Sequence, residues 1–178
     1  MLIVGIKKIK LSHIEELRTI AIKTFQETFS VDNTEDNMSA YLEHAFSVER
    51  LSAELKDHNA EFYFAYYGDR VIGYLKINYG QSQKELKDER AIQIERIYVL
   101  QQFHGKKIGQ LLLEKAIQIA RERNTDYVWL GVWEENERAI QFYNRNGFVA
   151  FDKHIFKLGE DEQTDIMMKL ALNIGENI

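Results

Sequence analysis

A strand-like segment, a glycine-containing loop and an amphipathic helix follow one another between residues 91 and 123, and this order constrains the fold most. The segment "AIQIERIYVL" (91–100) alternates apolar and polar side chains as a strand does. The loop "HGKKIG" (104–109) then leads into apolar residues at helical spacing. A second strand-like run, "YVWLGVW" (127–133), comes next, so the sequence predicts an α/β fold.

Further elements are predicted on both sides of this unit. The segments 61–67 and 71–79 predict an antiparallel hairpin, because only Gly68, Asp69 and Arg70 separate them. The absence of repeats and the length of 178 residues predict a single domain, 1–178. The other expected elements are an edge strand at 2–9, helices that begin after Ser12 (with Glu15 completing a capping box) and after Asn33 or Thr34, a helix at 47–57, a solvent loop at 80–90, a helix at 136–146, and strands near 148–157 and 164–171.

The composition excludes several kinds of chemistry. The chain has no cysteine, so disulfides, thiolate metal sites and an acyl-cysteine intermediate are excluded. A formal net charge of −5 argues against broad binding to nucleic acid, which needs a basic surface, and suits a cationic substrate. No stretch approaches the ~18 consecutive apolar residues of a membrane span, and no secretory signal is evident, so we expect a cytoplasmic protein. The five histidines lack metal-ligand spacing, and no metal is expected.

The loop before the helix has the features of an anion site. Unpaired backbone N–H groups and the helix dipole point outward together at a helix start, and this combination binds phosphate. Gly105 and Gly109 allow close approach of the backbone, while Lys106 and Lys107 can add charge-assisted contacts. The alternative is that the lysines are only solvated.

Two motifs resemble those of a known family. The segment "NERAIQFYNRNGF" (136–148) matches the pattern Asn-x-x-Ala-x-x-Phe-Tyr-x-x-x-Gly-Phe at every named position. In "HGKKIG", His104, Lys107 and Gly109 occupy the three named positions of the loop motif Gln/Arg-x-x-Gly-x-Gly/Ala, and the first two depart from it. Together with the order of elements, these motifs resemble the GCN5-related N-acetyltransferase (GNAT) superfamily over about residues 60–158.

The resemblance carries expectations about fold and activity. It implies a GNAT fold, with a mixed, mostly antiparallel twisted sheet, helices on both faces and a central splayed pair of parallel strands. The segments "TFQETFS" (24–30) and "IERIYVLQQFHGKKIG" (94–109) make the chain most similar to the PaiA-type branch, whose members acetylate spermidine and spermine. The implied activity is therefore transfer of acetyl from acetyl-CoA to a small-molecule primary amine, directly in a ternary complex. A homodimer is consistent with the family.

The resemblance also implies how acetyl-CoA is bound. Its pyrophosphate would lie on the main-chain amides of 105–110, its pantetheine between strands near 97–99 and 130–132, and its thioester near Tyr143. Gly131 would leave room for the cofactor arm, or would mark a strand bulge. The implied cofactor-binding residues are Ile97, Tyr98, Val99, His104, Gly105, Lys106, Lys107, Ile108, Gly109, Gln110, Asn136, Arg138, Ala139, Tyr143 and Arg145.

Several of these assignments have structural alternatives. Asn136 would hold the pantetheine or only cap its helix. Arg138 and Arg145 would reach the adenine 3′-phosphate or remain solvated. Tyr143, whose phenol is protonated at neutral pH, would be the general acid for the leaving thiolate, or an aromatic core residue.

The acceptor amine needs a base, because an amine of pKa ~10.4 is neutral in only about one molecule per few thousand at pH 7. Period-two alternation places Glu95 on one face with Gln93, Ile97 and Val99, so Glu95 is the predicted base, acting through water. The alternative is a structural carboxylate paired with a basic group. Backbone N–H near Tyr98 or Val99 would polarise the thioester carbonyl.

The predicted acceptor site combines aromatic and acidic side chains that suit a long, multiply charged amine. The alternative is a solubilising helix surface. The predicted substrate residues are Phe25, Glu27, Phe29, Glu35 and Tyr41, with Asp32, Asp36 and Glu43 nearby.

Other functions remain open at this stage. The chain could be an acyl-CoA sensor without turnover, in which Tyr143 only packs. It could acetylate a protein amine or an antibiotic. A transcriptional regulator is the third alternative, although no recognition-helix pattern is visible.

Overall fold

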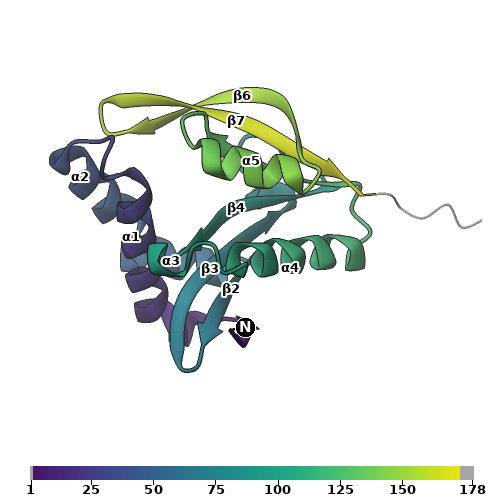
Figure 1. The fold of residues 1–178 in the computed structure, drawn as a ribbon, viewed down its shortest axis with the longest axis horizontal. Helices are drawn as coiled ribbons and strands as arrows, with labels where there is room; N and C mark the ends of the chain where they lie inside the picture. The colour runs from purple at the N-terminus through teal and green to yellow at the C-terminus, as the bar shows by residue number, and fades with distance from the viewer. Residues whose placement is uncertain (1, 173–178) are drawn as a thin grey trace, which may run out of the picture.

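The computed structural model describes residues 2–172 and places seven strands of that part of the chain in one sheet, in the order β1-β2-β3-β4-β5-β7-β6 (Figure 1). All neighbouring strands are antiparallel except β4 and β5, which are parallel. The strands are β1 (Val4–Lys8), β2 (Ala60–Tyr67), β3 (Arg70–Tyr79), β4 (Ala91–Val99), β5 (Tyr127–Trp133), β6 (Val149–Leu158) and β7 (Asp161–Ala171).

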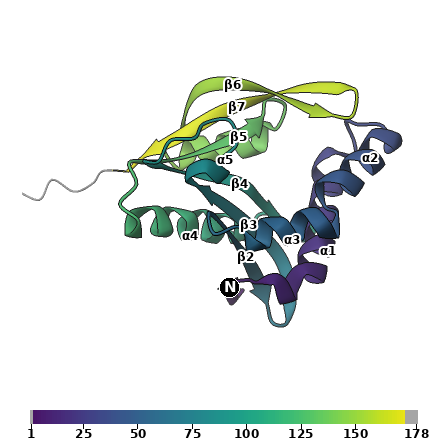
Figure 2. The same cartoon turned by 180° about the vertical axis from the view of Figure 1, so that it is seen from behind.

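Helices cover both faces of this sheet. Together with the strand pairing, this arrangement confirms the predicted α/β class and the mixed, mostly antiparallel topology. In Figure 1, α4 and α5 lie in front of the strands, and in the reverse view of Figure 2, α3 lies in front. No helix among the described residues is long and apolar enough to cross a membrane. The α-helices are α1 (Ile14–Phe29), α2 (Glu35–Ala45), α3 (Val48–Lys56), α4 (Ile108–Glu122) and α5 (Glu137–Arg145), and short 3₁₀ turns occupy Leu11–His13, Gly80–Ser82 and Gln101–Phe103.

The parallel strands β4 and β5 pair along only part of their length. Their register runs from Ala91 opposite Tyr127 to Ile94 opposite Leu130. Beyond these residues, β4 continues to Val99 and β5 to Trp133 without pairing to each other. The predicted splayed pair is therefore confirmed, and a gap opens in the middle of the sheet.

A β-bulge interrupts β4 at Glu95. Lys76 of β3 is opposite Arg96 and Ile77 is opposite Ile94, so Glu95 is the extra residue of the pair. The side chains of both Glu95 and Arg96 therefore reach the face that carries Lys76, where each lies within 4 Å of its ion partners.

The bulge overturns one prediction. Strict alternation placed Glu95 on one face with Ile97 and Val99, and this is wrong. Gln93 and Glu95 do share a face, since Asn78 Nδ2 donates to an oxygen of each. From Arg96 onward the phase changes, so that Ile97 and Val99 turn to the opposite face, toward α4 and α5.

The β6–β7 hairpin extends toward α1 and α2, and its turn contacts α2 (Figures 1 and 2). Asn37 Nδ2 donates to Asp161 Oδ2 at 3.0 Å, and Gln163 Nε2 donates to Asn33 Oδ1 at 3.2 Å. Gly159 in the hairpin turn has a φ of 64°, and a Cβ there would lie 2.4 Å from Asn37 Oδ1. The turn thus needs glycine both for its conformation and for its contact with α2.

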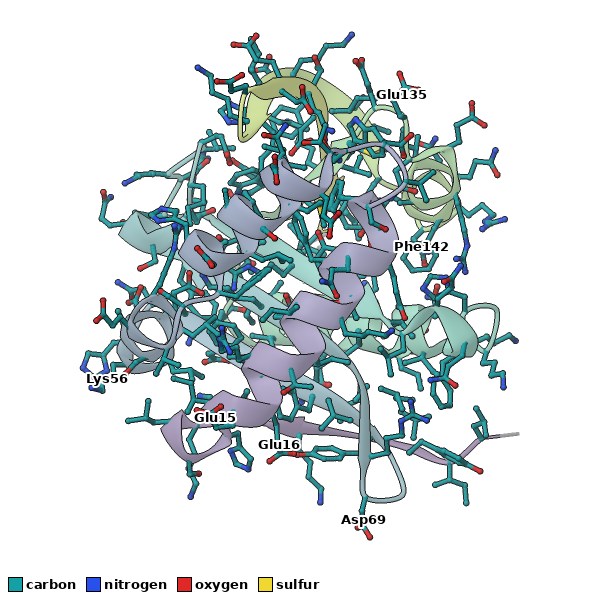
Figure 3. The ribbon with its side chains drawn as sticks, turned by 90° about the vertical axis from the view of Figure 1, so that its left-hand side faces the viewer. Glu15, Glu16, Lys56, Asp69, Glu135 and Phe142 are labelled. Carbon is teal, nitrogen blue, oxygen red and sulfur yellow. The ribbon has the colours of Figure 1, made fainter. Side chains whose placement is uncertain are left out.

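The sequence predicted the start of α2 correctly but not the start of α1. Thr34 caps α2 as predicted, because its hydroxyl accepts from Asn37 N at 3.2 Å. The Ser12 cap is wrong, since the chain makes a 3₁₀ turn there and α1 begins at Ile14 without a side-chain cap. The exposed Glu15 and Glu16 (Figure 3) favour this helix start through the dipole instead.

The segment 80–90 is also not the pure solvent loop that its polarity predicted. Gln83 is only 1% exposed, and its Oε1 accepts from Trp129 Nε1 at 2.7 Å. Its Nε2 donates to the carbonyls of Gly80 and Asp88. The buried amide fixes this loop against the sheet, which brings Lys84 and Glu85 to the cavity described below.

Candidate active site

The start of α4 presents a row of free backbone donors. No residue in the described range 2–172 accepts a hydrogen bond from the N–H groups of 105–110, and the first N–H used is that of Leu111, which donates to Lys107 O at 3.2 Å. Gly105 and Lys107 have φ angles of 76° and 64°, so left-handed residues alternate with others in this loop. Such a loop at a helix N-terminus forms a concave site for an anion.

The left-handed Lys107 explains the motif position that it occupies. A non-glycine residue in this conformation costs roughly 1–3 kcal/mol, which glycine avoids. The fourth position of the loop motif, where the resemblance expects glycine, is this position. A lysine thus adopts a conformation that glycine favours, and it brings an ammonium group to the start of α4.

His104, at the first motif position, turns back onto β4. Its Nε2–H donates to Val99 O at 2.7 Å, and its Nδ1 accepts from an Arg138 guanidinium N–H. The ring thus links the loop before α4 to both β4 and α5. Arg138 is exposed, but this hydrogen bond and its place in the cavity lining put it beside the start of α4.

Backbone donors also line the gap between β4 and β5. Leu100 N donates to Ile72 O of β3 at 2.9 Å. In an antiparallel pair the N–H groups point alternately to the two sides, so those of Ile97 and Val99 point into the gap, whereas that of Tyr98 points to β3. Of the two donors proposed for a thioester carbonyl, only Val99 has the required direction.

One cavity of about 1240 Å³ connects the anion site, the gap and the α1–α2 side of the sheet. This exceeds the 300–1,000 Å³ of common ligand pockets, so it suits two ligands together. Lys106 and Glu35 lie outside it: Lys106 Nζ lies over the Phe103 ring at 5.4 Å, and Glu35 is exposed in the first turn of α2. The predicted residues that line the cavity are Phe25, Glu27, Phe29, Tyr41, Glu95, Ile97, Tyr98, Val99, His104, Gly105, Lys107, Ile108, Gly109, Gln110, Asn136, Arg138, Ala139, Tyr143 and Arg145.

Tyr143 lies on the cavity side of α5 and is 6% exposed. Its ring packs against Phe142 and Phe148, with centroids 5.2 and 5.6 Å away. Burial raises the pKa of Tyr143, so the phenol keeps its proton at neutral pH. The residue is therefore at once part of the core and a protonated phenol that lines the cavity.

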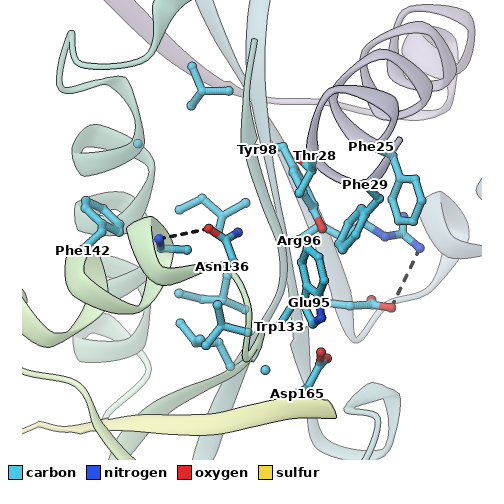
Figure 4. Close-up of a pocket in the computed structure, with 18 of the residues that line it drawn as sticks. Phe25, Thr28, Phe29, Glu95, Arg96, Tyr98, Trp133, Asn136, Phe142 and Asp165 are labelled. Atoms are coloured by element: carbon cyan, nitrogen blue, oxygen red, sulfur yellow. Dashed lines mark hydrogen bonds and ion pairs between the residues drawn. The ribbon is translucent and has the colours of Figure 1, made fainter. Parts of the chain in front are cut away.

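Asn136 caps α5, since its Oδ1 accepts from Ala139 N at 3.2 Å (Figure 4). The cap brings the start of α5 to the cavity across from the start of α4. Gln110 of α4 contacts the other end of α5, because its Nε2 donates to Oδ1 of the C-cap Asn146 at 2.8 Å.

Glu95 is held in a buried network of charges. It forms an ion pair with Lys76, lies 3.9 Å from Lys84 Nζ and 3.8 Å from an Arg96 nitrogen, and accepts from Asn78 Nδ2 at 2.8 Å. Burial opposes its charge, but the Arg96, Lys76 and Lys84 cations outweigh that effect and lower the pKa of Glu95 to about 2. A carboxylate of this pKa is a weak proton acceptor, and the geometry is that of the structural alternative.

The α1–α2 side of the cavity, where the sequence predicts the acceptor amine (the acceptor side), is aromatic. The Phe25 and Tyr41 rings stack with centroids 4.6 Å apart, and the Phe29 and Trp133 centroids are 5.7 Å apart. Glu27 lines this side, but its Oε2 accepts from Gln101 N at 2.8 Å, which fixes the loop after β4.

Asp165 of β7 is a cavity residue that sequence reasoning missed. Burial first, and then the charge of Glu85, raise the pKa of Asp165 to about 6, although His154 lowers it. The space beside Gly131 holds this carboxylate, since a Cβ there would lie 3.3 Å from Asp165 Oδ2. The available signal was that Asp165 alternates in phase with the buried Met167. Within residues 2–172, no group of His, Asp and Glu is arranged to hold a metal ion.

Comparison with known proteins agrees with this geometry. The chain is 37% identical over 170 residues to an uncharacterized N-acetyltransferase of Lactobacillus delbrueckii subsp. lactis, covering 94% of this chain and 98% of that protein. A spermidine N(1)-acetyltransferase of Thermoplasma acidophilum is 24% identical over 153 residues, covering 84% of this chain and 90% of that protein.

The fold has a close counterpart among solved structures. The PaiA N-acetyltransferase of Thermoplasma acidophilum, in complex with coenzyme A, superposes with a TM-score of 0.79 at 21% identity, covering 96% of this chain and 100% of that chain. The family model of the acetyltransferase (GNAT) family matches residues 14–148. The chain therefore belongs to the GNAT family of acetyltransferases.

Proposed function

We propose that the protein transfers acetyl from acetyl-CoA to a primary amine, with polyamines such as spermidine and spermine as the substrate class. The observation that carries this proposal is the continuous cavity, which joins free N–H groups at 105–110 to Tyr143 and then to an aromatic and acidic acceptor side. The similarity to a spermidine N(1)-acetyltransferase supports the choice of acceptor.

The residues at the start of α4 fit a pyrophosphate. The free N–H groups of 105–110 would bind its oxygens, and Lys107 and Arg138, both at the cavity, would add positive charge. The N–H group of Ile97 would bind the arm that lies in the gap between β4 and β5. Acetyl-CoA supplies an acetyl group activated as a thioester.

Tyr143 would act as the general acid. Its buried phenol holds a proton at neutral pH and would donate it to the departing sulfur. Val99 N–H would donate to the carbonyl oxygen on which charge develops, and oriented donors of this kind contribute a few kcal/mol in comparable sites.

The acceptor side would bind a cation in a water-poor, aromatic environment. Three acids line the cavity from separate segments: Asp32 after α1, Glu85 in the loop before β4, and Asp165 of β7. A carboxylate attracts an ammonium by about 1 kcal/mol in water and by more in a cleft. Several acids spread along the cavity suit an amine with several charges rather than one.

A panel of amines tests the proposal. Thiol release from acetyl-CoA is measured with spermidine, spermine, an aminoglycoside and a lysine-containing peptide, each at several concentrations. We expect the highest kcat/KM with a polyamine. Preference for the peptide or the antibiotic would overturn the polyamine assignment, and tight binding of acetyl-CoA without thiol release to any amine would favour a sensor.

A further inference from the structure

Asp165 lies at the point where the gap in the sheet meets the acceptor side. It is opposite Trp133 of β5 and His154 of β6 in the strand registers. Gly131, the first β5 residue beyond the paired segment, leaves the space that the carboxylate enters. Figure 4 shows Asp165 directed toward Glu95 and Trp133 across the cavity.

Asp165 differs from Glu95 in what its carboxylate contacts. Glu95 is bound by Lys76, Arg96, Lys84 and Asn78. Within residues 2–172, no side chain donates a hydrogen bond to Asp165 or forms an ion pair with it, and it borders the cavity. One carboxylate at this end is therefore committed to cations of the protein, and the other is available to a ligand.

The groups that face Asp165 come from three elements. Glu85, from the loop before β4, lies with its Oε1 3.3 Å from His154 Nε2 of β6, and Glu95 faces it from β4. Burial and the Glu85 charge raise the pKa of Asp165 to about 6, which a protonated His154 opposes. At pH 7 and above, Asp165 is ionised and can take up a proton.

We propose that Asp165, rather than Glu95, is the group that accepts the proton which the substrate ammonium must lose before acetyl transfer. This assignment rests on the proposed amine acetyltransferase function. One N–H bond of the ammonium breaks, its electron pair stays on nitrogen as the nucleophilic lone pair, and an O–H bond forms on Asp165. The acid then returns the proton to water in the cavity, so the step needs no oxidant, reductant or further reactant.

The energetic demand is large enough to require such a group. Deprotonating an amine of pKa ~10.4 at pH 7 costs roughly 4–5 kcal/mol in water. A positioned base close to the operating pH contributes about 10²–10⁴-fold in rate. Both carboxylates are weaker bases than the amine, but Glu95, with a pKa of about 2, is weaker than Asp165 by about four pKa units, so Asp165 is the better proton acceptor of the two.

The test is the pH profile of kcat/KM for spermidine with the wild type and Asp165→Asn. If the ammonium is deprotonated on the enzyme, the wild-type value should be nearly constant from about pH 7 to 9 and should fall below about pH 6, where Asp165 becomes protonated. Without the base, only free neutral amine reacts, so the variant should lose about 100-fold at pH 7 and rise nearly tenfold per pH unit up to about pH 9.

The matched control is Glu162→Gln, which neutralises an exposed carboxylate on the same strand outside the cavity. It should keep the wild-type profile. Glu95→Gln should lower stability but leave the plateau between about pH 7 and 9. Asp165→Ala with added formate provides a second variant, and recovery of turnover by the small carboxylate would support a proton-transfer role.

Calorimetric measurement of spermidine affinity without acetyl-CoA distinguishes a proton-accepting role of Asp165 from a role in binding the ammonium. If Asp165 only holds the ammonium, Asp165→Asn should weaken binding and raise KM while the shape of the pH profile stays as in the wild type, and this result would overturn the proposal. If the wild type acetylates no amine at all, the proposed function fails. Wild-type turnover with an unchanged profile in Asp165→Asn rejects the base assignment alone.

Discussion

Glu95, which lines the cavity, forms an ion pair with Lys76, whose side chain is only 2% exposed. Lys76 Nζ also lies 3.1 Å from Glu54 Oε2, and Glu54 in turn accepts two hydrogen bonds from Arg96, at 2.9 and 3.0 Å. Two cations and two anions thus balance one another between β3, β4 and α3. The network spans the bulge in β4, so it holds the strand in the shape that opens the gap.

Removing one member of this network should be costly. Lys76→Ala leaves two carboxylates short of a cation in a buried site, and we expect a loss of about 3 kcal/mol or more in the free energy of unfolding. Urea denaturation measures it. Lys8→Ala is the control, because Lys8 is 59% exposed in its pair with Glu61 and should cost less than about 1 kcal/mol. Equal losses in the two variants would contradict the role of the network.

Glu95 should also make stability depend on acid pH. Its folded pKa of about 2 lies below its ordinary value of 4.5, so its contribution is complete above about pH 5 and disappears as the pH falls toward 2. The difference corresponds to on the order of 3 kcal/mol. Between pH 2 and 6, the free energy of unfolding should therefore change more steeply with pH for the wild type than for Glu95→Gln. Parallel curves would mean that Glu95 is not the ionised partner.

The left-handed Lys107 predicts opposite outcomes for two substitutions. Lys107→Gly should hold or raise the free energy of unfolding, since glycine adopts a φ of 64° without strain, whereas Lys107→Val should lower it by roughly 1 kcal/mol or more. Thermal unfolding of both variants gives the comparison. Both should bind CoA less tightly than the wild type, because both lose the ammonium.

Gly109 should be needed for CoA binding rather than for folding. A Cβ there would meet only Phe142 Cζ, at 3.9 Å, so a side chain fits the protein itself. Gly109→Val should therefore fold normally but bind CoA at least about tenfold more weakly, because it fills the space in front of the α4 donors. Calorimetric titration with CoA measures this, and unchanged affinity would exclude the proposed pyrophosphate site.

Tyr143→Phe tests the general acid. The change removes one hydroxyl from a ring that stays packed between Phe142 and Phe148, so structure and CoA affinity should be kept. Turnover should fall by about 100-fold or more if the phenol protonates the departing sulfur. Stopped-flow measurement of thiol release with saturating substrates gives kcat. A variant with wild-type kcat would leave Tyr143 with a packing role only.

The spacing of apolar residues predicted most helices and strands, because in these segments the spacing matches the face that is buried in the fold. The hairpin of β2 and β3, and the segment from β4 through α4 to β5, have alternating or helical apolar spacing that agrees with their final environment. The motif around Tyr143 likewise lies on one helix, so its spacing alone brought Asn136, Ala139 and Tyr143 to one side of the cavity.

The residues that sequence reasoning misplaced depend on contacts between distant segments. The bulge at Glu95 adds one residue that no residue type marks, and it shifts every later side chain of β4 to the other face. Asp165 reaches the cavity only because β7 inserts between β5 and β6. Asn37 and Asp161, which join α2 to the hairpin, are 124 residues apart, and no local pattern contains such a pair.

Because β4 and β5 pair along only part of their length, the sheet of the free protein contains two strand segments whose facing edges are unpaired. The backbone groups along these edges offer the hydrogen bonds that a neighbouring strand would otherwise receive. An extended ligand arm seated there would take the place of a missing strand, so catalyst and cofactor would complete one another's secondary structure. Slower hydrogen exchange of the Ile97 and Val99 backbone amides after CoA binds would show these hydrogen bonds.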